Sequence, residues 1–148
     1  MTGAPPRSTS GATGPPGGAL SLRALGVLIL VMFALTSAVG GSLAAESSYL
    51  AVTLASHIGL ALGTVGVCLY ASAVASRPYR VRTRAFVRIA GLCAGGATLA
   101  GTYFLLFGPS DIALAAMSGF ALLGMVASAL IIVFGGASAR EAPGANPT

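Results

Sequence analysis

The stretch RPYRVRTRAFVR at residues 77–88 carries five arginines and lies between two long segments that contain no charged residue. Thirty uncharged residues separate Glu46 from Arg77, and 22 separate Arg88 from Asp111. A helix needs about 20 consecutive apolar residues to cross a hydrocarbon core of roughly 30 Å. The sequence around this stretch therefore predicts two membrane-spanning helices joined by a short, strongly basic connection.

Two further uncharged segments extend the pattern to both sides. There are 22 uncharged residues between Arg23 and Glu46, and 28 between Asp111 and Arg140. Each segment is expected to be helical, because a helix satisfies its own backbone hydrogen bonds in lipid. The predicted fold is all-α: a polytopic membrane protein with a four-helix transmembrane bundle within residues 19–138. The expected spans are Leu22–Leu43, Leu50–Ala75, Ala85–Phe107 and Ile112–Gly136.

The arginines predict the orientation of the chain. Every arginine lies before or at the start of the first span, after the last span, or between the second span and the start of the third, whereas the other two connections hold only Glu46 and Asp111. The positive-inside rule assigns the arginine side to the cytoplasm. We therefore expect a multi-pass protein of a prokaryotic plasma membrane with both termini cytoplasmic. The tails, residues 1–18 and 139–148, are rich in Pro, Gly, Ala, Ser and Thr and are predicted to be disordered.

The composition excludes several functional classes. Apolar residues make up 55% of the chain and charged residues 7%, against roughly a quarter charged in ordinary soluble domains. The net charge of +5 comes from arginines beside apolar runs, so we expect membrane lipid as a partner and no nucleic acid. With one histidine, three acidic residues and no motif of catalytic spacing, the chain is not expected to be an enzyme.

Two segments sixty residues apart indicate an internal repeat. The segments LASHIGLAL at 54–62 and LAAMSGFAL at 114–122 share five of nine positions. This offset equals the length of one helical hairpin, so the first two spans would correspond to the last two, in the same orientation. Chance similarity in a chain so rich in Ala and Leu is the alternative.

His57 and Met117 occupy equivalent positions in this repeat and are the candidate site residues. At 1.5 Å per residue, both are expected roughly 8–11 Å below the outer boundary of the membrane. Ionisable residues inside membrane spans usually face inward and mark functional sites. Histidine and methionine are an established axial pair for haem iron. Both residues are therefore predicted to bind a cofactor, a b-type haem.

Small residues continue the helix face of each candidate. The face of His57 runs through Ala61, Thr64 and Cys68, and that of Met117 runs through Ala121, Gly124 and Ser128. Two such faces would leave room for a flat cofactor. In layout the chain resembles four-helix membrane cytochromes and haem-handling proteins, although those carry further histidines in paired helices.

Simpler interpretations stay open for each of these residues. His57 would serve as a hydrogen-bonding contact between helices, and Met117 as a gap-filling core residue. The glycines at 59, 63 and 66 lie nearly opposite His57, and a close helix contact there would turn the histidine elsewhere. Cys68 and Cys93 are read as small apolar residues, with a Cu(I) site assisted by Met125 or Met32 as the alternative.

Three functions remain as hypotheses. The first is a non-catalytic accessory or assembly component of a larger membrane complex or homo-oligomer. The second is a haem-binding electron carrier or haem-handling protein that uses His57 and Met117. The third is a channel or carrier for a neutral small solute, for which no selectivity element is evident.

Overall fold

A computed structural model describes residues 21–45, 51–75 and 81–135. These residues form four helices and no strand, and each helix is long and apolar enough to cross a membrane. The predicted all-α, four-helix membrane bundle is confirmed. The tails predicted to be disordered lie outside the described residues. The helices are α1 (Leu22–Ala45), α2 (Ala51–Ala75), α3 (Val81–Phe107) and α4 (Asp111–Gly135).

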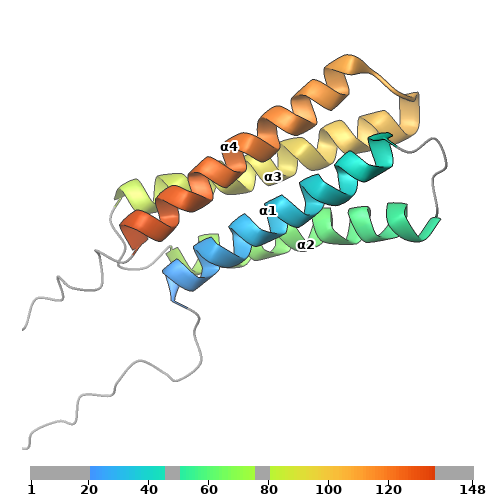
Figure 1. The fold of residues 1–148 in the computed structure, drawn as a ribbon. Helices are drawn as coiled ribbons and strands as arrows, with labels where there is room; N and C mark the ends of the chain where they lie inside the picture. Colours follow the sequence, from blue (N-terminus) through green and yellow to red (C-terminus); the bar gives the residue numbers. More distant parts are fainter. Residues whose placement is uncertain (1–20, 46–50, 76–80, 136–148) are drawn as a thin grey trace, which may run out of the picture.

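The helices form a ring in which each packs against two neighbours, in the order α1, α2, α3, α4 and back to α1. The diagonal pairs, α1 with α3 and α2 with α4, do not approach each other closely. Successive helices run in opposite directions, so α1 begins and α4 ends at the same end of the bundle (Figure 1). We call this the Arg23 end and the opposite one the Asp111 end. The central axis is therefore left to side chains or to empty space.

Local signals explain where the helices begin and end. The Ser21 hydroxyl accepts a hydrogen bond of 3.2 Å from the Ala24 amide, which caps α1. α4 begins with the carboxylate of Asp111, a favourable charge at a helix N-terminus. α3 stops at Gly108, whose φ of 89° suits glycine and whose amide donates to the Phe104 carbonyl at 3.0 Å. A connection of three residues thus turns α3 into α4.

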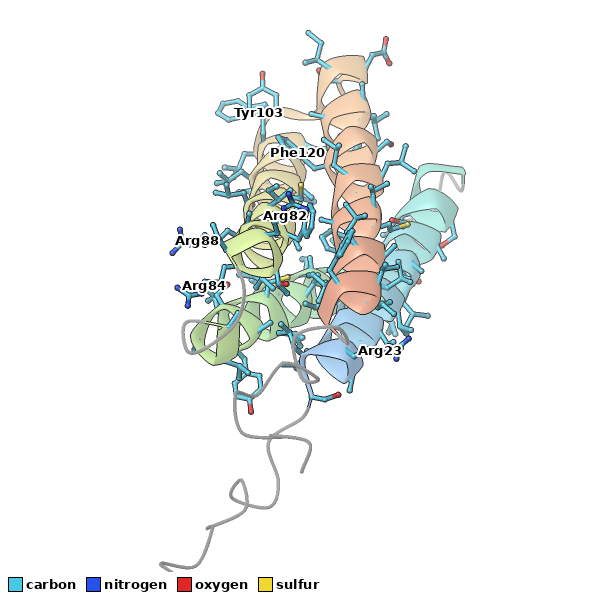
Figure 2. The ribbon with its side chains drawn as sticks, turned by 90° about the vertical axis from the view of Figure 1, so that its left-hand side faces the viewer. Arg23, Arg82, Arg84, Arg88, Tyr103 and Phe120 are labelled. Atoms are coloured by element: carbon cyan, nitrogen blue, oxygen red, sulfur yellow. The ribbon has the colours of Figure 1, made fainter. Side chains whose placement is uncertain are left out.

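The predicted start of the third span was wrong by four residues. α3 begins at Val81 rather than Ala85, so Arg82 and Arg84 belong to the helix. A helix does not have to stop at the edge of the hydrocarbon core, because long arginine side chains reach the aqueous boundary from within it. The arginines in the described part of the chain all lie toward the Arg23 end (Figure 2), namely Arg23, Arg82, Arg84 and Arg88.

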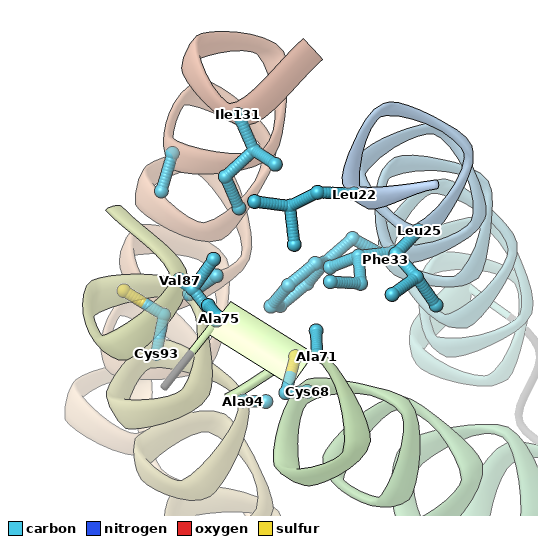
Figure 3. Close-up of a cluster of buried hydrophobic side chains, with 13 residues drawn as sticks. Leu22, Leu25, Phe33, Cys68, Ala71, Ala75, Val87, Cys93, Ala94 and Ile131 are labelled. Carbon is cyan, nitrogen blue, oxygen red and sulfur yellow. The ribbon is translucent and has the colours of Figure 1, made fainter. Parts of the chain in front are cut away.

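The hydrophobic core occupies the half of the bundle nearest the Arg23 end. α1 supplies its bulky side chains, and α2 and α3 face them mainly with alanine and cysteine (Figure 3). This pairing of large with small residues lets the helices pack closely. The cluster comprises Leu22, Leu25, Ile29, Phe33, Cys68, Ala71, Ala75, Val87, Ala90, Cys93, Ala94, Ala127 and Ile131.

The buried positions repeat along the chain. Each buried residue of α2 has a buried counterpart sixty residues later in α4, and four buried residues of α1 have buried counterparts sixty-one residues later in α3. This pattern supports a twofold repeat of hairpins along an axis parallel to the bundle. The pairs are Thr64/Gly124, Cys68/Ser128, Ala71/Ile131 and Ala75/Gly135, and Leu22/Thr83, Gly26/Val87, Ile29/Ala90 and Phe33/Ala94.

Candidate functional site

An internal space lies between the helices, in the half of the bundle toward the Asp111 end. It consists of two adjoining cavities of about 390 and 200 Å³, and the larger one falls within the range of ordinary ligand pockets, about 300–1,000 Å³. We call the two together the chamber. All four helices contribute to its shared wall, which comprises Gly40, His57, Ala61, Ala97, Thr98, Leu114 and Met117.

Phe33 forms the floor of the chamber. It lines the larger cavity and also belongs to the buried core. Its ring packs on Gly124 of α4, with Cε1 and Cε2 only 2.6 and 2.7 Å from the position that a Cβ atom there would take. A glycine at 124 is therefore needed for this packing, which separates the open half of the bundle from the closed half.

His57 projects from α2 across to α1. Its Cε1 atom lies 2.7 Å from the position of a Cβ atom on Gly40, so glycine is what lets α1 pass the ring. The ring also lies beside the backbone of Thr36, but its Nδ1 atom is enclosed and has no hydrogen-bond partner. An unpaired buried polar atom costs about 1–3 kcal/mol. The ring lines both cavities, but Nδ1 itself is closed off from them, so a ligand would meet the rest of the ring.

Met117 holds the equivalent place in the second hairpin. Its Cε and Sδ atoms lie 3.7 and 4.0 Å from the position of a Cβ atom on Gly101 of α3. Each hairpin therefore rests a side chain of its second helix on a glycine of its first. The structure brings both predicted site residues into one chamber, from the diagonally placed helices α2 and α4.

The threonine hydroxyls of the chamber donate within their own helices. Thr36 donates to the Met32 carbonyl at 2.7 Å, and Thr98 donates to the Ala94 carbonyl at 2.8 Å. Thr64 donates to the Leu60 carbonyl at 2.7 Å. Because each donor is used, the hydroxyls offer a ligand only lone pairs. Among the described chamber residues, His57 contributes the one enclosed nitrogen or oxygen without a partner.

The inward faces predicted from the sequence are confirmed. On α2, Thr64 and Cys68 are buried and Ala61 lines the chamber. On α4, Ala121 lines the chamber, and Gly124 and Ser128 are buried. The faces of His57 and Met117 therefore both turn toward the bundle axis.

The glycines opposite His57 do not make the close contact that would turn it away. A Cβ atom on Gly59 or Gly66 would meet nothing within 4 Å. Only Gly63 has a neighbour, the Cε atom of Met32, 3.0 Å from its Cβ position. Although Gly63 packs closely on Met32, His57 still lines the chamber, so this contact does not turn the histidine away.

The two cysteines are free and buried in the core cluster. Figure 3 draws them apart, with the sulfur of Cys93 directed away from Cys68. The described part of the chain also holds no group of three or more His, Cys, Asp or Glu side chains placed to bind a metal. The arrangement favours the interpretation of both cysteines as small packing residues.

Sequence reasoning missed the contributions of α1 and α3 to the chamber. Both helices follow the same order, in TSAVG at 36–40 and ATLAG at 97–101, with a hydroxyl residue three positions before the glycine. These segments are sixty-one residues apart, so the search at an offset of sixty did not align them. A search at both offsets would have found them.

No protein-family model matches the chain, and neither a curated protein nor a solved structure shows a match to it.

Proposed function

We propose that the chain is a non-catalytic membrane component that holds a hydrophobic small molecule between its four helices. The observation that carries this proposal is the chamber itself, whose wall is apolar apart from His57 and a few hydroxyl groups. Such a combination of apolar walls with few polar groups is typical of ligand sites. A binding role suits an accessory or assembly subunit of a larger membrane complex or a homo-oligomer.

A chamber-filling variant tests this function. Ala97→Phe would place a ring in the shared wall, whereas Leu99→Phe changes a lipid-facing residue two positions away and serves as the matched control. Protein purified in mild detergent is denatured, and the released molecules are quantified by mass spectrometry. We expect a molecule released in near-stoichiometric amount from the wild type and the control but not from Ala97→Phe. Equal release from Ala97→Phe, or none from the wild type, would contradict the proposal.

A b-type haem is the second candidate, because His57 and Met117 line the same two cavities. The two residues would serve as axial ligands, and the iron would give the chain a role in electron transfer or haem handling. The wall fits the two haem propionates less well, because no Arg or Lys lines either cavity.

The haem candidate is tested by oxidised and reduced absorption spectra after expression with haem supplied. His57→Ala should abolish the band, and Met117→Leu should shift it. Met32→Leu, which changes a methionine outside the chamber, should leave the band unchanged. A featureless wild-type spectrum, or a full band in His57→Ala, excludes haem.

The channel hypothesis has weaker support from the described residues. The chamber ends at Phe33, and side chains such as Leu25, Ile29 and Ile131 fill the Arg23 half, each at most 1% exposed. A solute would need these side chains to move before it could cross.

We also infer that the Arg23 end faces the cytoplasm of a prokaryotic cell. The described arginines gather at that end, as the positive-inside rule expects, and the one described acidic residue, Asp111, lies at the other. Both termini would then be cytoplasmic, and the chamber would lie in the outer half of the plasma membrane.

A further inference from the structure

The chamber opens sideways, toward the space that lipid occupies around the bundle. A residue that both lines a cavity and has an exposed side chain marks the mouth of that cavity. Leu62 of α2 (59% exposed) and Leu105 of α3 (51%) meet this description for the smaller cavity. The larger cavity has such exposed lining residues in Ser37 of α1 and Leu122 of α4, of which Leu122 is 64% exposed. One mouth thus lies between α2 and α3, and the other lies between α4 and α1.

The repeat relates these mouths to each other. Leu62 and Leu122 are equivalent residues, and each lies eleven positions from the start of its helix, about 17 Å along the axis. This depth is inside the hydrocarbon region rather than at the aqueous surface. A ligand that passes either of these two mouths comes from the lipid phase. Leu114 and Gly41 are also exposed lining residues, and they mark a further opening nearer the Asp111 end.

The chamber wall restricts the polar part of such a ligand. No Arg, Lys, Asp or Glu lines either cavity, so a carboxylate or phosphate head would be buried without a compensating charge. The threonine donors are already used within their helices. His57 lines both cavities, and the Ser37 and Ser118 hydroxyls line the larger one, so these side chains are the hydrogen-bonding groups that a ligand would meet. The ligand is thus neutral, with an apolar body and a head group that can hydrogen-bond to the imidazole or to a serine hydroxyl.

The shape of the wall favours a flat head group. Gly40, Ala61 and Ala97 present small side chains around His57, and a mouth on each side leaves a path for an apolar tail. We propose, on the basis of the function proposed above, that the chamber binds the head of an isoprenoid quinone. One quinone carbonyl accepts a hydrogen bond from the His57 imidazole, and the tail leaves through a lateral mouth into the membrane.

The test uses the full chain in lipid nanodiscs, titrated with a decyl-substituted benzoquinone whose carbonyls carry ¹³C. We expect saturable binding near one molecule per chain and a lowered carbonyl stretching frequency in the infrared spectrum. His57→Leu should weaken the affinity roughly tenfold, the scale of one net hydrogen bond, and should remove the frequency shift. A purely structural role for His57 would not move the carbonyl frequency.

Mouth variants test the lateral route. Leu62→Trp and Leu122→Trp should each slow quinone uptake several-fold, whereas Leu99→Trp, a lipid-facing change away from the chamber, should not.

Binding that is unchanged in His57→Leu, or that does not saturate in the wild type, would overturn the inference. Release of a different molecule that the quinone fails to displace, haem included, would overturn the quinone assignment and leave the binding function standing. If Ala97→Phe also released the bound molecule in the wild-type amount, both the quinone assignment and the proposed binding function would fail.

Discussion

The Cε1 atom of His57 lies 2.7 Å from the position that a Cβ atom on Gly40 would occupy. An added methyl group and the imidazole ring cannot share that space. The ring is the end of a side chain that can rotate, so it will yield before the α1 backbone does.

Gly40→Ala is therefore expected to displace the imidazole and weaken ligand binding severalfold, with a change in unfolding free energy of about 1 kcal/mol or less. Gly59→Ala is the matched control, because a Cβ atom there would meet nothing within 4 Å and the residue lines neither cavity. Binding titrations and unfolding of both variants provide the measurement. Equal affinities in the two variants would show that the position of the ring is unimportant.

The contact between Phe33 and Gly124 gives a stability prediction. A methyl group at 124 would overlap the Phe33 ring, and overpacking of this kind costs about 1–3 kcal/mol. Gly124→Ala should lower the unfolding free energy accordingly in a detergent denaturation series, whereas Gly119→Ala, in open space, should not. The penalty should shrink in a Phe33→Leu background. If Gly124→Ala lowered the unfolding free energy equally in the Phe33→Leu background, overlap with the Phe33 ring would not be the cause.

The turn between α3 and α4 depends on the backbone of Gly108. Its φ of 89° is a left-handed conformation that costs an L-residue roughly 1–2 kcal/mol. Gly108→Ala should therefore lower the midpoint of thermal unfolding. Gly95→Ala, a helical glycine with no neighbour near its Cβ position, should leave it unchanged or raised. A similar decrease in both variants would argue against backbone strain as the cause.

The orientation can be measured with single cysteines at two highly exposed positions. Val81 lies at the Arg23 end and is 81% exposed, and Ile112 lies at the Asp111 end and is 82% exposed. An impermeant maleimide applied to intact cells should label Ile112→Cys but not Val81→Cys. The unsubstituted chain is the control, since its own two thiols are buried. The reverse pattern would place the Arg23 end outside.

The fold was predictable because charge alone divides this chain. Each of four uncharged segments is long enough to span a membrane, and every one became a helix. The ends were less predictable, as the start of α3 at Val81 shows, because charges mark the limit of the hydrocarbon core and not the limit of the helix.

The site was predictable only on α2 and α4. His57 drew attention as an ionisable residue, and the repeat then pointed to Met117. α1 and α3 have no ionisable residue at the chamber, and their matching segments, 36–40 and 97–101, lie at an offset of sixty-one rather than sixty. The role of Gly40 depends on its distance from His57 in space, which sequence periodicity does not contain.

The repeat also bears on how the chain enters the membrane. Arg23 near the start of α1 and Arg84 near the start of α3 are sixty-one residues apart, the offset that relates the buried positions of these helices. Each hairpin thus carries its own topogenic charge in the same register, so neither depends on the other for its direction. We therefore expect insertion to proceed as two like events, one for each hairpin. The chamber then forms last, when two units that already span the bilayer meet.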